Sequence, residues 1–280
     1  MAVRSRANRD VGRKPRVRRA YFECRYGQLH VYNAMPPGGG FEEATTLMCL
    51  HETPMTGRMF AGALALLGYD RSVYAPDIPG FGESEAPAAP ASIKDYAAAI
   101  GDFLDTMRFR QIDVLGCQTG ALIAAELAVS RPTQVRRVVL SSVPAMSAAE
   151  RAAFLRAPWP AAASEDGCYL LAEWRRTTAH ARRPLNLDVA ARRVAAMLHN
   201  GPNASWGMQA AAQYAVDERL RLITQPVLIL RPKDEFWDAT LRVREFLPAA
   251  RNVDLPGHGA DWCEASPEAL VDAVSQFLHG

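Results

Sequence analysis

Residues 112–132 constrain the fold of this chain more than any other segment. They begin as a short apolar run, turn sharply at Gly116 and continue as an alanine-rich stretch from about Thr119. This strand–turn–helix pattern, with glycines at 116 and 120, matches the G-x-S-x-G motif, in which a nucleophile stands between the two glycines. The residue at that place is Gln118, and a carboxamide is a very poor nucleophile. The segment therefore predicts the kind of turn that carries a catalytic nucleophile. Gln118 excludes the usual covalent step by the side chain at that position.

Strand-like and helix-like segments alternate along most of the chain. The segment 21–32 is typical of a hairpin that turns at 25–28, and helical patterns follow the strand at 45–50 and run over 92–107 and 267–278. Ser92 and Ser266 are the expected N-caps of the last two helices. Further short apolar runs, typical of strands, lie at 72–75, 112–115, 137–141, 226–230 and 252–255. This alternation predicts an α/β fold, with a mostly parallel central sheet and helices on both faces.

The same patterns predict three parts along the chain. Residues 20–142 and 226–280 would form the α/β core, and 143–225, which has helical patterns and no convincing strand, would be a helical cap inserted between two strands. Residues 1–19 would be a basic, disordered tail. The first 20 residues hold eight Lys or Arg against one Asp, a net charge of +7. Because the whole chain carries +2, the remaining 260 residues carry a net charge of −5. Such a tail can bind nucleic acid or target an organelle, but without aromatic residues or an amphipathic period it is expected only to aid solubility.

Composition narrows the class of protein. No apolar run approaches the ~18–20 residues of a membrane helix, and no apolar segment near the start resembles a secretory signal. The five cysteines are scattered without C-x-x-C spacing, which argues against a disulfide framework or a zinc site. We therefore expect reduced thiols, a cytoplasmic location, no membrane partner and no nucleic-acid partner. A homodimer is compatible with the sequence.

Five motifs occur in the order known from one large family. They are His51-Glu52-Thr53-Pro54, the segment 77–84 (DIPGFGES), the turn 116–120, Lys233-Asp234-Glu235 after a buried strand, and Pro256-Gly257-His258-Gly259 after the last strand. Over about residues 20–280 the chain resembles the α/β-hydrolase superfamily. The resemblance implies an α/β-hydrolase fold with a helical cap. Two positions depart from the family pattern, namely Glu52, where a glycine is usual, and Gln118, where the nucleophile is usual.

The resemblance assigns roles to the remaining machinery. It implies that the backbone N–H groups of Thr53 and Thr119 form an oxyanion hole, and neither donor depends on the side chain at 118. Thr119 N–H would also lie at a helix N-terminus, whose dipole favours negative charge. His258 would be the general base, oriented by a carboxylate. Spacing slightly favours Glu235 as that carboxylate, but a one-residue change in loop length favours Asp234, and both stay open. Taken alone, His258 would be an ordinary histidine in a glycine-rich loop.

Other residues near these motifs have simpler interpretations. Cys117 precedes the tip of the turn and should point away from the site, while Cys49 and Cys263 are expected to serve packing. His51 is expected to be a structural hydrogen-bonding residue, and Glu52 to face solvent. Three cap tryptophans could line an apolar substrate pocket or belong to the core, namely Trp159, Trp174 and Trp206. The arginine pairs 175–176, 182–183 and 192–193 are most simply solvated helix faces.

These observations favour an enzyme that uses a base and an oxyanion hole without a Ser nucleophile. Gln118 would orient a water molecule or the substrate, because its amide both donates and accepts hydrogen bonds. Hydrolase-like, lyase and cyclase reactions fit this machinery, and the substrate would be a small, largely apolar molecule. No cofactor and no metal are expected. A second hypothesis is an inactive relative that binds a small ligand or a protein partner. A third is an ordinary hydrolase that has lost its nucleophile.

Overall fold

The computed structural model describes residues 14–37, 44–156, 163–179 and 186–280. These residues form an eight-stranded sheet with the order β1-β2-β4-β3-β5-β6-β7-β8. The strands are β1 (Arg18–Cys24), β2 (Gly27–Ala34), β3 (Ala44–Leu50), β4 (Arg71–Pro76), β5 (Ile112–Cys117), β6 (Val135–Ser141), β7 (Val227–Pro232) and β8 (Arg251–Leu255). The β1–β2 and β2–β4 pairs are antiparallel, and the other neighbouring pairs are parallel. The predicted mostly parallel sheet is thus confirmed.

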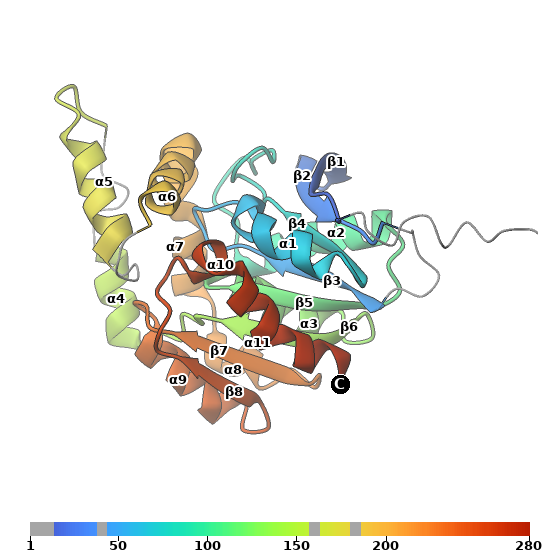
Figure 1. Ribbon diagram of the computed structural model, residues 1–280. Helices are drawn as coiled ribbons and strands as arrows, with labels where there is room; N and C mark the ends of the chain where they lie inside the picture. Colours follow the sequence, from blue (N-terminus) through green and yellow to red (C-terminus); the bar gives the residue numbers. More distant parts are fainter. Residues whose placement is uncertain (1–13, 38–43, 157–162, 180–185) are drawn as a thin grey trace, which may run out of the picture.

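Helices surround this sheet and gather beyond one end of it (Figure 1). The described helices are α1 (Ala61–Leu67), α2 (Ile93–Thr106), α3 (Thr119–Ser130), α4 (Ala148–Arg156), α5 (Cys168–Ala179), α6 (Leu187–Asn200), α7 (Trp206–Gln213), α8 (Val216–Leu220), α9 (Trp237–Phe246), α10 (Trp262–Ala265) and α11 (Pro267–His279). Two short 3-10 helices, η2 (Gly57–Phe60) and η3 (Gly201–Ser205), precede α1 and α7. None of the helices in these described ranges has the length and apolar character required to cross a membrane.

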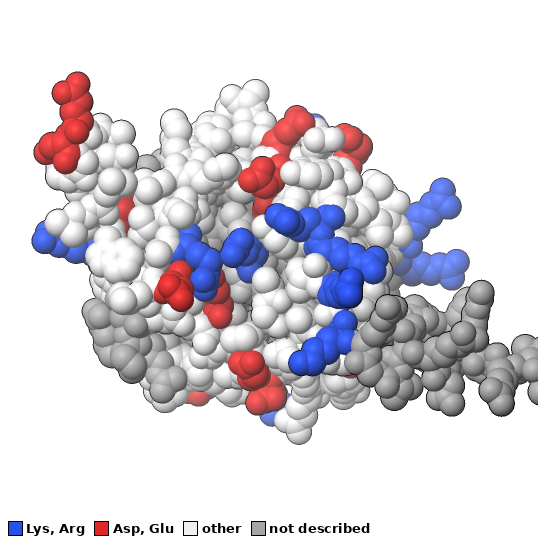
Figure 2. Space-filling view, turned by 45° about the horizontal axis from the view of Figure 1, so that its top comes forward, with Lys and Arg blue, Asp and Glu red and all other residues white. Residues whose placement is uncertain are grey.

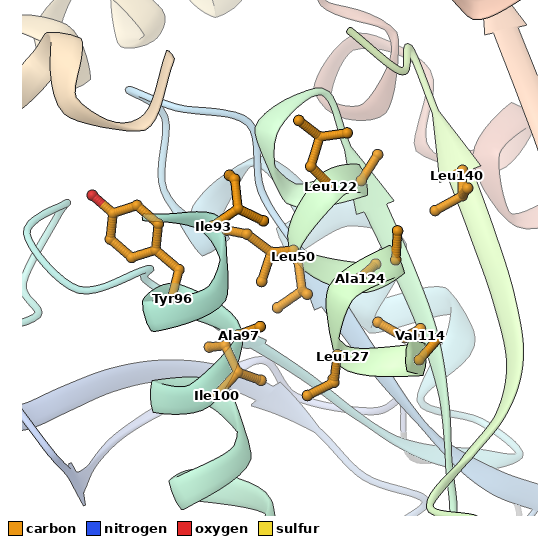
Figure 3. Packing of buried hydrophobic residues seen from close by; sticks show 14 of the residues in the cluster. Leu50, Ile93, Tyr96, Ala97, Ile100, Val114, Leu122, Ala124, Leu127 and Leu140 are labelled. Carbon is orange, nitrogen blue, oxygen red and sulfur yellow. The ribbon is translucent and has the colours of Figure 1, made fainter. Parts of the chain in front are cut away.

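Alternation along the parallel strands divides the core into two layers. Successive strand side chains point to opposite faces, so Val114 of β5 belongs to one buried cluster and Leu115 to the other. The first cluster includes buried residues of α2, α3, α8 and α9, and the second includes those of α1, α10 and α11. Figure 3 shows side chains of α2 and α3, such as Ile93 and Leu122, in one buried cluster with Leu50 and Val114 of the strands. Both faces of the sheet are therefore covered, as predicted.

The hairpin β1–β2 lies at one edge of the sheet. Its register pairs Cys24 with Gly27 across a turn at 25–26, within the predicted hairpin. Strand β1 begins at Arg18, so the predicted tail of residues 1–19 is two residues too long at its end. Most of that tail, residues 1–13, lies outside the described residues.

The predicted cap region 143–225 contains α4 to α8 and no strand among its described residues. In Figure 1, α4, α5, α6 and α7 lie together beyond one end of the strands. The end of the region behaves differently, because Val216 and Leu220 of α8 are buried in the same cluster as α2 and α3. The part of the predicted cap that contains α8 therefore packs as part of the core.

The two predicted N-caps differ in the structure. Ser92 caps α2 with a reciprocal capping box, in which its side chain accepts from the Asp95 amide and Asp95 accepts from the Ser92 amide. Ser266 stands at the N-cap of α11, but its side chain makes no capping hydrogen bond. Pro267 at the first position of that helix, which needs no amide donor there, supplies the start signal instead.

Candidate functional site

The turn at 116–120 adopts the strained geometry that the sequence predicts. Gln118 has φ +47° and ψ −114°, a region that non-glycine residues seldom occupy. The two glycines allow the strand and helix to approach each other. A Cβ on Gly116 would lie 2.1 Å from the Gly120 carbonyl oxygen, and one on Gly120 would lie 2.2 Å from the Leu50 carbonyl oxygen. Backbone strain of this kind is retained where the surroundings enforce it, often at functional sites.

Gln118 is held by its backbone and by its side chain. Its amide donates to the Ser141 carbonyl at 2.9 Å, which ties the turn to the end of β6. Its carboxamide Nε2 donates to Glu235 Oε1 at 3.2 Å. Gln118 is 5% exposed, so this contact brings together two of the predicted site residues at a nearly buried position. The turn is therefore built to aim the Gln118 carboxamide at the loop that follows β7.

A cavity of about 600 Å³ opens over Gln118 and Glu235. Its walls come mostly from apolar residues of the predicted cap region 143–225 and of the segment after β7. Glu150 and Arg176 add charged groups to that of Glu235. The apolar lining residues are Pro54, Met146, Ala153, Phe154, Ala179, Met208, Phe236 and Ala239. This size and lining are typical of a pocket for a small organic molecule.

Sequence reasoning missed most of these walls. The cap segments carry no motif that marks a pocket position, so Met146, Phe154 and Met208 gave no signal in the sequence. Phe236 directly follows the predicted acidic pair, and that position is the one signal that could have identified it.

The two predicted oxyanion residues lie beside Gln118. Thr53 Oγ1 and Thr119 Oγ1 are 2.9 Å apart, and Thr119 Oγ1 is 3.3 Å from Met208 Sδ of α7. Thr119 is the first residue of α3, so its amide has no acceptor within the helix and lies at the positive end of the helix dipole. Thr53 and Gln118 both line the cavity. The local geometry is thus suitable for holding a developing negative charge.

The two candidate acids have different surroundings. Glu235 lines the cavity and accepts from Gln118. Asp234 is buried, accepts from Ser142 Oγ at 2.5 Å and accepts from the Phe236 amide at 2.9 Å. Burial and the nearby Glu235 charge raise the pKa of Asp234 to about 7. Ser142 follows β6 at φ +54°, so the end of this neighbouring strand supplies a hydroxyl to Asp234.

His258 lies in the loop after β8 and is half-buried. Its carbonyl accepts from the Lys233 amide at 2.7 Å, which ties its loop to the loop of the acidic pair. Its ring lies 5.7 Å from the Trp262 ring, centroid to centroid. The described residues that line the Gln118 cavity do not include His258. The structure therefore brings the His258 loop beside Asp234 and Glu235, while Gln118 and Glu235 supply the polar groups at the cavity wall.

Glu52 does not face solvent, and that expectation is wrong. It is 3% exposed and forms an ion pair with Arg193 of α6. Burial raises the pKa of Glu52, and the Arg193 charge opposes that rise. The side chain of Arg193 is only 11% exposed, so the predicted solvated face at 192–193 is also wrong for this residue. An isolated buried carboxylate is costly, and the guanidinium partner is the physical reason that Glu52 can turn inward.

The Glu52–Arg193 pair borders the predicted catalytic residues. Both side chains line a small polar cavity of about 60 Å³, which also touches Gln118 and Glu235. A second contact strengthens this link between α6 and the loop after β3, because Asn200 Nδ2 donates to the Pro54 carbonyl. The two departures from the family pattern, Glu52 and Gln118, therefore lie next to the same cavity.

The tryptophan predictions have mixed outcomes. Trp159 lies outside the described residues. Trp174 and Trp206 are half-buried, and neither is among the described residues that line the two cavities at Gln118. Trp206 packs against the core cluster that contains α2 and α3. Met208, two residues after Trp206, is the α7 residue that reaches the cavity.

The remaining predicted structural residues have packing roles. His51 Nδ1 is hydrogen-bonded to the Glu52 carbonyl, and its Nε2 accepts from the Ile78 amide, both at 2.8 Å. Cys117 is buried with its Sγ 3.3 Å from that of Cys263, on the sheet face that carries α1 and α11. Cys49 is buried in the same cluster. Within the described residues, no group of three His, Cys, Asp or Glu side chains is arranged to hold a metal ion.

Comparison with known proteins places this geometry in a family. A family model described as "Alpha/beta hydrolase family" matches residues 37–273. A 2-hydroxymuconate semialdehyde hydrolase from Pseudomonas putida is 28% identical over 227 residues, which cover 74% of this chain and 77% of that protein. A protein of the same name from Pseudomonas sp. (strain CF600) is 42% identical over 76 residues, 26% of either chain.

The coverage of other relatives is partial. Matches to several curated relatives span only 26% to 33% of those proteins' lengths. Among solved structures, the enol-lactonase from Burkholderia xenovorans LB400 has a TM-score of 0.73 at 18% identity, covering 91% of this chain and 100% of that one. That likeness concerns the fold. With the family model matching most of its length, the chain belongs to the alpha/beta hydrolase family.

Proposed function

We propose that this protein is a family enzyme that acts on a small, largely apolar molecule in the Gln118 cavity without forming a covalent serine intermediate. One observation carries the proposal. The strained turn that carries the nucleophile in the family motif presents a carboxamide, and that carboxamide is hydrogen-bonded to Glu235 at the wall of a cavity of about 600 Å³. The strained geometry is kept although the nucleophile is absent.

The chemistry follows from the hydrogen-bonding capacity of the groups. Glu235 uses one Nε2 proton of Gln118, which leaves the amide oxygen and the second N–H to orient a water molecule or a substrate group. His258, the proposed general base, or Glu235 then takes the proton. The amides of Thr53 and Thr119 hold the negative charge that develops on the substrate oxygen. A general base contributes roughly 10²–10⁴-fold, and an oxyanion donor about 10²–10³-fold, so useful rates do not require a nucleophile.

Hydrolysis is the first reaction class to test, and lyase or cyclase chemistry could use the same groups. Two relatives are named 2-hydroxymuconate semialdehyde hydrolase, which makes that semialdehyde and other small carbonyl compounds a sensible first panel. The apolar walls of the cavity support this choice, and Arg176 and Glu150 supply charge at its lining.

The test combines turnover with covalent labelling. The purified protein would be incubated with 2-hydroxymuconate semialdehyde and with p-nitrophenyl acetate and butyrate, and separately with a serine-directed fluorophosphonate. We expect turnover of at least one compound, no covalent adduct by mass spectrometry, and a fall in kcat of about 10²-fold or more in His258→Ala. Glu218→Gln, an exposed change on α8, is the matched control and should keep full activity. An adduct on the wild-type protein would contradict the non-covalent route.

Binding without turnover is the second candidate, and one observation favours it. His258 is not among the described residues that line the Gln118 cavity, so the cavity can hold a ligand without the base. This candidate predicts that His258→Ala binds an apolar probe such as 8-anilinonaphthalene-1-sulfonate as tightly as the wild type, with no turnover by either protein. Turnover that is lost in His258→Ala would reject it.

A further inference from the structure

A second large cavity lies on another part of the molecule. Its volume is about 680 Å³, and it is bordered by the β1–β2 hairpin, by the loop containing Asp77 and Gly82, by η2 and by α6. Among its described lining residues, none also lines either cavity at Gln118. It is therefore separate from the site assigned to the proposed reaction.

One wall of this cavity, called the platform below, carries aromatic and cationic side chains of the β1–β2 hairpin, namely Arg19, Tyr21, His30 and Tyr32. In the antiparallel register, Arg19 pairs with Tyr32 and Tyr21 pairs with His30. Residues two apart on a strand point to the same face, and direct cross-strand partners share that face, so the four side chains form one patch. The His30 ring lies 5.1 Å from the Tyr21 ring and 4.7 Å from the Tyr32 ring, centroid to centroid. Tyr21 is 52% exposed, so its ring is available to a ligand.

Cationic groups from other elements converge on the platform. Arg58 of η2 and Arg192 of α6 line the same cavity as Arg19. Burial and the Asp77 charge raise the pKa of Tyr32, whereas the charges of Arg58 and Arg19 oppose that rise. Arg192 is partly neutralised by Glu264 at 2.6 Å. Figure 2 shows a band of Lys and Arg side chains across one face of the molecule.

The acidic residues of the cavity have partners other than Arg19 and Arg58. Asp77 is 1% exposed, and its oxygens are occupied by the Gly57 and Glu83 amides and by His30 Nδ1. Glu83 is exposed and lies 3.8 Å from His199. The ion pairs found within the described residues do not include Arg19 or Arg58.

We propose that this cavity binds a small anionic group attached to a planar aromatic ring. Guanidinium groups bind phosphate and carboxylate oxygens in bidentate geometry, and Arg19 and Arg58 offer two such groups. The exposed Tyr21 ring can pack against an aromatic ligand, and the cations beside it add attraction to the ligand ring. A phosphate and a carboxylate share this chemistry, and both kinds of ligand belong in the test.

The test measures binding by isothermal titration calorimetry at low ionic strength. The two complete probes are adenosine 5′-monophosphate, whose halves are adenosine and inorganic phosphate, and phenylacetate, whose halves are benzyl alcohol and acetate. At least one complete probe should bind about tenfold or more tightly than either of its own halves, because ring and anion contacts add. Binding of the monophosphate alone would identify a phosphate site, and binding of phenylacetate alone a carboxylate site.

Variants locate the binding. The Arg19→Gln/Arg58→Gln double variant should weaken the bound probe at least about tenfold, the effect of losing one charged hydrogen bond or more. Arg110→Gln, an exposed arginine outside this cavity, and Glu235→Gln, at the Gln118 cavity, should leave the affinity unchanged. Circular dichroism would check that each variant is folded. The proposal is overturned if neither complete probe binds at millimolar concentration, or if the double variant binds as well as the wild type. Neither result bears on turnover at Gln118.

Discussion

At the scale of single residues, the turn around Gln118 separates backbone function from side-chain function. The backbone keeps φ +47° and the close approach of the two glycines, although the side chain is not a nucleophile. The Thr119 amide, one of the two proposed oxyanion donors, belongs to this same backbone and does not depend on the side chain at 118. The Gln118 side chain reaches Glu235, so a hydrogen-bonded group stands where the family motif has a reactive one.

The glycines of this turn can be tested by stability. In Gly120→Ala, the new Cβ would lie 2.2 Å from the Leu50 carbonyl oxygen and 2.6 Å from that of His51. Because backbone atoms cannot rotate away, we expect a loss of about 3 kcal/mol in the free energy of unfolding, despite the higher helix propensity of alanine. Gly257→Ala is the control, since its Cβ would have no neighbour within 4 Å, and its effect should be within about 0.5 kcal/mol. Urea unfolding measures both, and equal stabilities would refute the packing argument.

The position of Gln118 can be tested by restoring a nucleophile. Gln118→Ser should gain p-nitrophenyl butyrate hydrolysis about 10²-fold above Gln118→Ala, because the amides of Thr53 and Thr119 and the base His258 are proposed to remain in place. Gln118→Ala removes the same carboxamide without adding a hydroxyl, which makes it the matched control. Fluorophosphonate labelling at the substituted position, located by mass spectrometry, should accompany the gain. If both variants stay equally inactive and unlabelled, His258 is not poised to activate this position.

At the scale of elements, α6 connects the predicted cap region 143–225 to the loop after β3. Arg193 reaches Glu52 and Asn200 reaches Pro54, which brackets Thr53, the proposed oxyanion residue. Asn200 Oδ1 also accepts from the Gly82 amide at 3.0 Å. Helix α6 thus contacts both the loop after β3 and the loop containing Gly82, which are separate motifs in the sequence. The position of Thr53 therefore depends on the docking of α6.

The buried ion pair gives this link a measurable strength. Arg193→Met leaves Glu52 buried without its cation, and we expect a loss of about 3–5 kcal/mol in the free energy of unfolding. Arg192→Met changes the neighbouring residue, whose side chain is 41% exposed and pairs with Glu264, and should cost about 1 kcal/mol or less. The Glu52→Gln/Arg193→Met double variant should recover part of the loss, because the stranded charge is gone. A loss no larger for Arg193 than for Arg192 would show that the pair is not a stabilising contact.

At the scale of the whole molecule, the sequence predicts the architecture better than the site. Apolar runs such as 112–115 and turn signals are local, so the parallel sheet and the helices on both of its faces could be predicted. The pairing of Glu52 with Arg193 joins residues far apart in the chain, and no periodicity encodes it. The cavity walls have the same problem, because Met146, Met208 and Phe236 meet only after the central helices have docked.

The choice between the two acids shows this limit most clearly. Spacing slightly favoured Glu235, and a one-residue change in loop length favoured Asp234, so the sequence left both open. The structure separates them through partners on other elements, with Ser142 at the end of β6 for Asp234 and Gln118 at the end of β5 for Glu235. Such roles depend on which strands are neighbours in the sheet, and a single sequence does not contain that order.

The buried Asp234 also shapes the pH dependence of global stability. Its pKa is raised from 3.8 to about 7, first by burial and then by the Glu235 charge. Between about pH 4 and pH 7 the unfolded chain has lost this proton while the folded protein still holds it. The unfolded state then binds fewer protons, so this group lowers stability as pH rises through that window. We expect the free energy of unfolding, measured in urea, to fall less steeply from pH 4.5 to pH 7.5 in Asp234→Asn than in the wild type.

The exposed Asp254 is the control, because its pKa is shifted in the direction opposite to that of Asp234. The hydrogen bond from Arg231 holds the pKa of Asp254 below its usual value, so its contribution is present above the ordinary carboxyl pKa and is lost only as pH falls below it. Asp254→Asn should therefore leave the slope between pH 4.5 and pH 7.5 unchanged. If Asp234→Asn has the same slope as the wild type, the Asp234 carboxyl is ionised in the folded protein throughout this range, and its hydrogen bonds to Ser142 and Phe236 outweigh the cost of its burial.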